Sequence, residues 1–273
     1  MTLIWCDRKN YKEKFTDWLK DKKSIVIGAS DSQEIRDISS WVREKATCKI
    51  GKAIYDSDVE IQRHILLEAL TYDLGYKNKF PNFFELREKI KNNIKPLTIT
   101  QITGHEIEAR EDVHINGTSQ VVNIRDISNL KITPEVSREM QANDLLDEFI
   151  KDLQSITSTS HILFLIQFGK EGFSKFSTDF KHWFLHIFCP KILLCENVKI
   201  CVLNQGELNA FANFENACQE KLTENLGFDD IMEETKNYIE NYEAFCCGAI
   251  DPDTKSISYN EFKRKLSTYI NRV

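Results

Sequence analysis

The chain has 273 residues, 41% of them hydrophobic and 29% charged, which is enough to bury a sizeable core without disulfide bonds. There are 36 Lys and Arg against 42 Asp and Glu, so the net charge is −6, and this balance argues against a general nucleic-acid-binding protein. No stretch approaches the roughly 18 consecutive apolar residues of a membrane span, and the apolar part of MTLIWCDRKNYKEK is too short for a signal peptide. We therefore expect a cytoplasmic protein without a membrane partner.

In the first 95 residues, helical patterns alternate with short apolar runs that predict buried strands. The predicted elements are a helix over 9–21, a strand over 24–27, a helix capped by Asp31 or Ser32, a strand over 48–56, a helix over 59–74 and a helix over 82–92. Gly28 breaks the first strand, and Gly75 stands where a C-terminal helix glycine belongs. Such alternation is typical of parallel βαβ units.

Between residues 96 and 134 the pattern changes to alternating polar and apolar residues. The alternation runs through Thr98–Thr103 and recurs around Val113 and Val122. It predicts a small antiparallel β insertion with half-polar faces, which we expect at the surface as a place where a partner binds.

The strand–helix alternation resumes after the insertion. We predict, in order, a helix capped by Asn143, a strand over 161–168, a helix over 179–188, a strand over 198–206 and helices over 208–224, 229–245 and 260–270. The predicted fold class is α/β, with a P-loop NTPase-like parallel sheet flanked by helices, an antiparallel β insertion and a helical C-terminal part. The expected divisions are two halves of the core (1–95 and 135–207), the insertion (96–134) and the helical subdomain (208–273).

A strand, a glycine turn and a helix form the place where P-loop proteins hold phosphate. A working loop reads GxxxxGK[ST]: backbone N–H groups cradle the phosphates and the Lys neutralises their charge. From Gly28 the chain reads GASDSQEI, so Gln33, Glu34 and Ile35 occupy the Gly, Lys and Ser/Thr positions. Glu34 would repel a phosphate and Ile35 cannot ligate magnesium, while Asp31 adds further negative charge.

The second phosphate-handling position is the Walker B strand, an apolar strand that ends in acidic residues. The candidate strand reads LFLIQFGK, in which Gln167 stands where the Asp belongs and Gly169 and Lys170 follow it. Because both positions fail together, the sequence predicts a fold that has lost its catalysis, with no catalytic residue and no cofactor.

The order of elements resembles that of the inactive STAND (iSTAND) domains, which are relatives of the STAND and AAA+ P-loop NTPases of prokaryotic conflict and immune systems. The segments that carry the resemblance are SIVIGASDS, ILLEALTYDLG, LLDEFIKDLQSITSTSHILFLIQFGK and WFLHIFCPKILLCENVKICVLNQGE, within roughly residues 9 to 245. The resemblance implies a catalytically inactive adaptor or scaffold, not an enzyme, that couples detection to an effector. Its implied partner is a protein effector or sensor that is encoded nearby; nucleic acid is not expected, and an oligomer stays open.

Two alternatives remain open. One is a nucleotide-binding switch that retains ATP or ADP without hydrolysis. The other is a zinc-dependent enzyme, because His182, His186 and Cys189 lie at i, i+4 and i+7 of a helix. HxxxH lacks the Glu of HExxH, however, and the aromatic neighbours favour packing.

Three other patterns have structural explanations. DPDTKSISYNEF resembles a calcium loop, but Lys255 stands at its fifth position, so a capped turn before the last helix fits better. The lysines of the first 23 residues alternate with acidic residues, which is typical of a solvated helix face. None of the eight cysteines forms a CxxC pair, so most are expected to be small buried hydrophobes.

Overall fold

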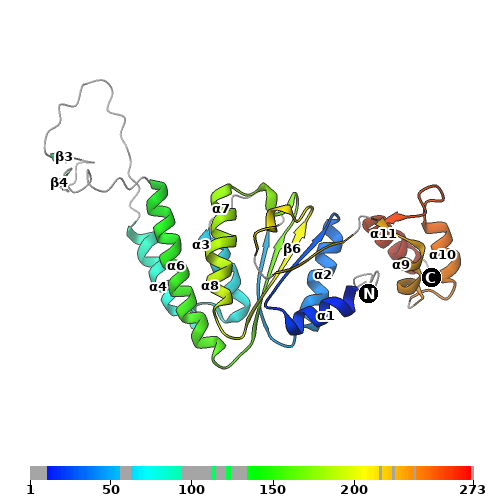
Figure 1. Cartoon of the computed structure of the whole chain (residues 1–273), viewed down its shortest axis with the longest axis horizontal. Coiled ribbons are helices and arrows are strands. Elements are labelled where there is room, and N and C mark those ends of the chain that lie inside the picture. Colours follow the sequence, from blue (N-terminus) through cyan, green and yellow to red (C-terminus); the bar gives the residue numbers. More distant parts are fainter. Residues whose placement is uncertain are drawn as a thin grey trace, which may run out of the picture.

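The computed structural model describes residues 11–55, 63–93, 112–114, 121–123, 134–214, 217–222, 225–236 and 238–271. A central sheet is covered by helices on both faces, and the last helices gather at one end of the molecule (Figure 1). The strands are β1 (Ser24–Ala29), β2 (Lys49–Tyr55), β3 (Asp112–His114), β4 (Val121–Asn123), β5 (Ile162–Phe168), β6 (Val198–Gln205), β7 (Cys218–Lys221), β8 (Asn225–Leu226) and β9 (Ile257–Ser258).

The α-helices are α1 (Tyr11–Asp21), α2 (Ser32–Lys45), α3 (Arg63–Thr71), α4 (Pro81–Asn93), α6 (Pro134–Thr157), α7 (Thr178–Trp183), α8 (Cys189–Leu193), α9 (Phe228–Thr235), α10 (Tyr242–Ala249) and α11 (Tyr259–Ile270). Short 3-10 helices are η1 (Tyr72–Leu74), η2 (Tyr76–Asn78), η3 (Gly172–Lys175) and η5 (Asn209–Phe211). Between α7 and α8 the turn Phe184–Phe188 is a π-helix, labelled η4.

The main sheet has five parallel strands in the order β2-β5-β6-β1-β7. The chain therefore crosses from β1 to β2 at the far side and returns through β5 and β6, until β6 lies beside β1. Two small antiparallel pairs, β3 with β4 and β8 with β9, lie outside this sheet. The predicted α/β class with a parallel sheet is thus confirmed.

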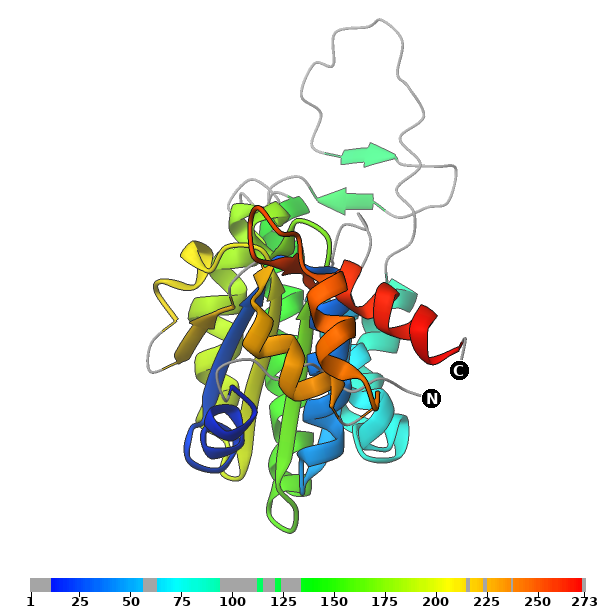
Figure 2. The same ribbon diagram turned by 90° about the vertical axis from the view of Figure 1, so that its right-hand side faces the viewer.

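Each face of the sheet carries its own apolar core. Helices α3, α4, α6, α7 and α8 pack against one face, where Phe164 and Ile166 of β5 are fully buried. Helices α1 and α2 pack against the other, where Leu163 and Leu165 are buried, and the C-terminal elements extend the same apolar cluster, with α11 on α2. Figure 2 shows the C-terminal helices in front of this second face. Successive side chains of a strand point to opposite faces, and helices cover both faces here, so β5 is apolar along its whole length.

Most predicted elements are confirmed, but three are wrong. The helix expected over 229–245 is two helices, α9 and α10, which are separated by a non-helical stretch. The helix expected over 208–224 contains β7, a strand at the sheet edge whose polar sequence CQEK hides the usual apolar run. The chain after residue 207 therefore completes the main sheet. Asn143 does not cap a helix: α6 begins at Pro134, and Asn143 lies inside it. A Pro at the first helical position is compatible with a helix start.

The predicted β insertion falls largely outside the described residues. Its two described strands pair antiparallel, with Val113 opposite Val122, as the alternation predicted. The Thr98–Thr103 segment lies outside the described part.

Replacing residues 96–134 with a short linker is expected to leave the core folded. Helices α4 and α6, which flank the segment, pack side by side, and β3 and β4 pair with each other instead of with the main sheet (Figure 1). A single cooperative thermal transition in the shortened protein, followed by circular dichroism, would agree with this expectation. Loss of cooperativity, with the intact chain as control, would mean that the segment belongs to the core.

Candidate site at the carboxyl end of β1

The topology of the sheet marks one place where a ligand could bind. From the carboxyl end of β1 the chain passes to α2 on one face, and from the end of the neighbouring β6 it passes to η5 on the other. Neighbouring strands whose connections leave toward opposite faces open a crevice at their carboxyl ends, and ligands of open α/β sheets bind there. The crevice between β1 and β6 is therefore the candidate site, and it contains the predicted loop from Gly28 to Ile35.

The start of α2 is capped by the protein's own carboxylate. Asp31 Oδ1 accepts hydrogen bonds from the backbone N–H of Gln33 at 2.7 Å and of Glu34 at 3.3 Å. These are the N–H groups that a helix start offers to an anion. The predicted cap is thus confirmed as Asp31, and a negative charge already occupies the place where the helix dipole favours one.

The last helix closes over the same carboxylate. Asp31 Oδ2 accepts from the backbone N–H of Asn260 at 3.2 Å, in the first turn of α11. Nearly two turns further along α2, Asp37 Oδ2 accepts from the hydroxyl of Tyr259 at 2.6 Å and pairs with Lys263 at 3.1 Å. The side chains of Asp37 and Lys263 are about nine-tenths buried, so these contacts fix α11 against α2.

The β6 side of the crevice is filled as well. A Cβ built on Gly28 would lie 2.8 Å from Leu208 Cδ2, so the Leu208 side chain lies directly over the glycine turn. Gln205 Nε2 donates to Ser30 O at 3.2 Å, and the backbone N–H of Gly206 donates to Ala29 O at 2.9 Å. The remaining polar atom of that glutamine, Oε1, is an acceptor and therefore of the wrong polarity for phosphate oxygens.

The predicted loop residues lie where the sequence placed them, at the first turn of α2. Ile35 is fully buried in the core beneath α2, and Glu34 is 1% exposed. Gln33 donates through Nε2 to Asp37 Oδ1 at 3.0 Å. Neither Glu34 nor Ile35 presents its side chain to solvent, so neither is placed to meet a bound phosphate.

Gln167 lies near the carboxyl end of β5 and is 2% exposed. Alternation along the strand places its side chain with Leu163 and Leu165 on the face covered by α2. Because β6 lies between β5 and β1, Gln167 shares a sheet face with the start of α2 without being next to Gly28 in the sheet. A neutral amide at this position supplies no carboxylate for a metal ion.

The structure does not bring the three zinc candidates together. His182 and His186 are exposed, with ring centroids 4.9 Å apart, whereas Cys189 is fully buried. The π-helical turn between them changes the helical register, and burial holds the pKa of the Cys189 thiol well above its usual value. Among the described residues, no group of three or more His, Cys, Asp or Glu side chains converges as a metal site.

The cysteines behave mainly as buried apolar residues, as predicted. Cys189, Cys195, Cys201 and Cys246 are buried, while Cys247 is exposed. Desolvation raises the pKa of Cys201 to about 12 and also raises that of Cys246. Since the thiolate is the reactive form, these two buried thiols are poorly suited to nucleophilic chemistry.

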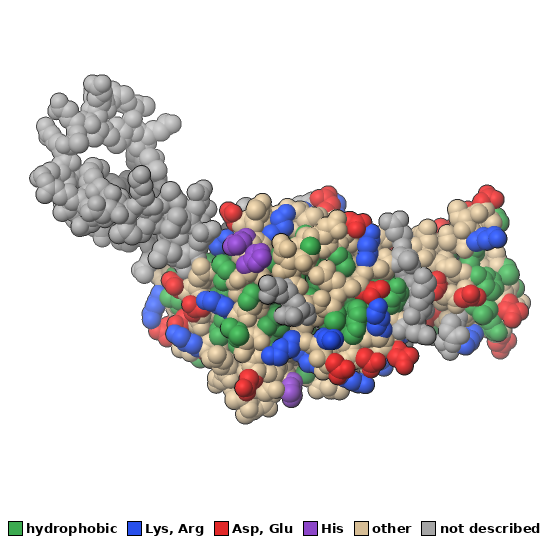
Figure 3. Space-filling view, in the orientation of Figure 1, with side chains coloured by type: hydrophobic (Ala, Val, Ile, Leu, Met, Phe, Trp, Pro, Cys, Tyr) green, Lys and Arg blue, Asp and Glu red, His purple; other side chains and the backbone are tan. Residues whose placement is uncertain are grey.

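The segment that resembles a calcium loop has the structural role that was predicted, whereas two lysines of α1 pair with acidic residues of other elements. Asp251 Oδ1 accepts from the backbone N–H groups of Asp253 and Thr254 at 2.9 and 2.8 Å, which makes a capped turn and lowers the pKa of Asp251. On α1, Lys12 pairs with Glu234 at 3.8 Å and Lys14 with Glu220. Figure 3 shows charges of both signs interspersed over the face it draws.

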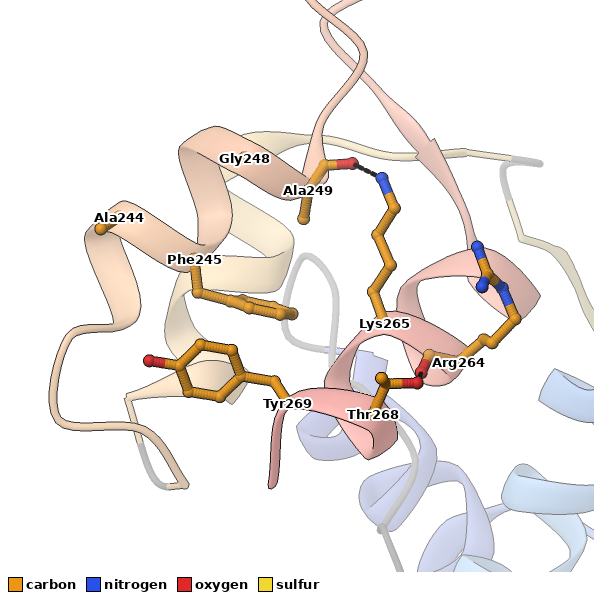
Figure 4. Close-up of a pocket in the computed structure, with 8 residues that line it drawn as sticks. All are labelled: Ala244, Phe245, Gly248, Ala249, Arg264, Lys265, Thr268 and Tyr269. Carbon is orange, nitrogen blue, oxygen red and sulfur yellow. Dashed lines mark hydrogen bonds between the residues drawn. The ribbon is translucent and has the colours of Figure 1, made fainter. Parts of the chain in front are cut away.

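A small hollow of about 370 Å³ lies between α10 and α11 (Figure 4). The rings of Phe245 and Tyr269 meet edge to face on its apolar side, 5.3 Å between centroids. Lys265 on its rim donates to Ala249 O at 2.8 Å and pairs with Glu261 at 3.3 Å. That cation is thus already used to hold α10 and α11 together.

Comparisons with known proteins add little to this description. No protein-family model matches the chain, and no curated protein matches it. Among solved structures, it is similar to the crystal structure of Stu0660 of Streptococcus thermophilus, at 12% identity and a TM-score of 0.23, over 99% of this chain and 88% of that one. A likeness at this TM-score carries no argument about function. Among the described helices, none is both long and apolar enough to cross a bilayer.

The sequence alone missed the residues that close the crevice from outside the loop. Leu208 and Asn260 lie far along the chain, and their backbone or apolar contacts have no motif. The run Asn204-Gln205-Gly206 is a usable signal, because polar residues at the end of a buried strand lie at the carboxyl edge of a parallel sheet.

Proposed function

We propose that this protein is a catalytically inactive, P-loop NTPase-like adaptor of the iSTAND kind, which couples detection to a protein effector in a prokaryotic defence or signalling system. The observation that carries the inactive part is the occupation of the crevice. Asp31 takes the N–H groups of the helix start, and Leu208 covers Gly28. The sequence resemblance described above supports the adaptor part.

The parallel sheet supports this proposal in one respect. The strand before the glycine turn is β1, and the candidate Walker B strand, β5, is separated from it by β6. A phosphate at the β1 turn and a metal ion held at the end of β5 would both lie at the carboxyl edge of the sheet, as phosphate chemistry requires. The arrangement therefore suits a phosphate-binding ancestor, whereas the side chains Glu34 and Gln167 do not suit the chemistry.

The purified protein is expected not to hydrolyse ATP above background with magnesium present. No acidic side chain stands at the Gln167 position to hold the metal, and Glu34 replaces the phosphate-binding Lys. Phosphate release measured over hours, with Gln167→Ala as the matched variant, tests this. Turnover that disappears in Gln167→Ala would contradict the proposal. Micromolar ATP or ADP binding without turnover would instead favour the nucleotide switch.

A further inference from the structure

Two histidines lie together on the surface of the helical segment that leads from α7 into α8. The side chains of His182 and His186 are both exposed, and their ring centroids are 4.9 Å apart, with the ring planes at 40°. Residues four apart lie on one face of a helix, about one turn from each other. Figure 3 shows histidine side chains gathered on the face that carries α7 and α8. The backbone thus brings the two imidazoles together without help from another element.

Packing explains the aromatic neighbours of the two histidines but not the histidines themselves. Trp183, Phe184 and Phe188 are at most 1% exposed and fix the segment on the core. The two imidazoles lie on the solvent side of the same segment, and neither forms a hydrogen bond with another residue of the described chain. Their ring nitrogens are therefore available to a ligand, on a support that is held rigidly from behind.

The π-helical turn contributes to this arrangement. It spans Phe184–Phe188 and includes His186, and the backbone N–H of Cys189 that follows it donates to Phe184 O, five residues back. This wider turn shifts the register of the chain, so Cys189 lies in the core while His186 stays at the surface. Single π-helical turns inside helices occur frequently at functional sites.

The charges around the pair are mixed. Lys181 donates to Ser174 O at 2.9 Å, and Arg63 donates to Asp179 O at 3.4 Å. The exposed Asp179 adds a carboxylate one turn before His182. A cation at this place would consequently be held by the imidazole nitrogens and not by a strong negative field. Imidazole suits Ni²⁺, Cu²⁺ and Zn²⁺, whereas Mg²⁺ and Ca²⁺ prefer oxygen ligands.

We propose that His182 and His186 form a chelating site for one late first-row divalent ion, of the class of Ni²⁺, Cu²⁺ and Zn²⁺, with water in the remaining coordination positions. Two protein ligands are fewer than the four of a structural zinc site and the three of a catalytic one, so the ion is exchangeable and the site is not an active site. Because both ligands are already in place on one helix, binding needs little ordering of the chain. The site goes beyond the adaptor function and does not rest on it.

Titration of the untagged full-length protein with Ni²⁺ and with Zn²⁺, in competition with a chromogenic metal indicator, tests the proposal. We expect one ion per chain and no competition from Mg²⁺. His182→Gln and His186→Gln are each expected to weaken binding at least about tenfold, because even changes to residues that only support a metal ligand cost 10- to 100-fold in affinity. His161→Gln is the matched control: this histidine is also exposed but lies just before β5, and its loss should leave the affinity unchanged.

Nuclear magnetic resonance locates the ion independently of affinity. Paramagnetic Ni²⁺ is expected to broaden the imidazole C–H signals of His182 and His186 before those of the other histidines, while circular dichroism shows that each variant is folded. Equal affinity in the parent and in either pair variant would overturn the proposal. Loss of binding in Cys247→Ser would assign the ion to the exposed thiol instead, and one ion per two chains would assign it to a bridge between copies. None of these outcomes depends on nucleotide or on a partner protein, so they leave the inactive-adaptor proposal to its own assay.

Discussion

Replacing Gly172 by alanine is expected to lower the free energy of unfolding by at least about 3 kcal/mol. Gly172 has a φ of +65°, a left-handed conformation that costs an L-residue roughly 1–2 kcal/mol. A Cβ there would also lie 2.1 Å from the backbone oxygen of Gln205 and 2.7 Å from Asn204 Oδ1. The first of these atoms belongs to the main chain and cannot rotate away, so β6 itself would have to shift.

The substitution would also destabilise two loops, because Asn204 forms hydrogen bonds to both of them at this position. Its Oδ1 accepts from the N–H of Phe173 at 2.7 Å, and its Nδ2 donates to Glu207 O at 2.8 Å. Asn204 is 1% exposed, so a displaced amide would leave buried polar groups unpaired. The loops after β5 and β6, and with them Leu208, depend on this contact.

Gly248→Ala is the matched control for this substitution. Gly248 lies inside α10, and an added Cβ there has no atom within 4 Å. Since alanine favours helix by about 1 kcal/mol over glycine, this variant should be as stable as the parent or slightly more stable. Thermal melts followed by circular dichroism compare the two variants. A Gly172→Ala protein that melts with the parent would show that the loop after β5 adjusts freely.

Local sequence patterns predicted the parts of the fold that depend on local chemistry. The apolar runs located β1, β5 and β6, Asp31 was expected as a cap, and Gly75 has the positive φ of a C-terminal helix glycine. Each of these signals concerns a residue and its neighbours within one or two turns of the chain.

What the sequence could not predict depends on contacts between distant segments. Strand β7 is short and polar, so its own sequence does not predict a strand. It is one because it pairs with β1 at the edge of the sheet. The seating of α11 on α2 depends on Tyr259 and Lys263 meeting Asp37, more than 200 positions away in the chain. No periodicity or motif marks such pairs, so the closure of the candidate site by α11 and Leu208 appears only in three dimensions.

Because the crevice is closed, putting P-loop side chains back into the loop is not expected to restore phosphate binding. In a vacant crevice, the right side chains would be sufficient to bind phosphate. Here the helix start already holds the Asp31 carboxylate, whose other oxygen is bonded to α11. A phosphate group would have to displace a charge of its own sign and break a contact between two parts of the fold.

The variant that combines Gln33→Gly, Glu34→Lys and Ile35→Thr is therefore expected not to bind nucleotide tightly. It supplies the phosphate Lys and a magnesium hydroxyl, but Asp31 remains near the phosphates and Gln167 provides no metal ligand. Ile35 is fully buried, so Thr there places a hydroxyl in an apolar core at about 1–3 kcal/mol if it is unpaired. Lys at the buried Glu34 position adds a further desolvation cost.

Titration calorimetry with ATP and magnesium should show no dissociation constant below about 100 μM, which corresponds to roughly −5.5 kcal/mol. Gln33→Gly alone is the control for the change in the loop backbone, and circular dichroism establishes whether each variant is folded. If the folded triple variant binds ATP at low micromolar concentration, the crevice is open in solution, and Asp31 and Leu208 yield to the ligand. The nucleotide-switch function would then be favoured over the inactive adaptor, because a crevice that opens for ATP retains the physical capacity to respond to it.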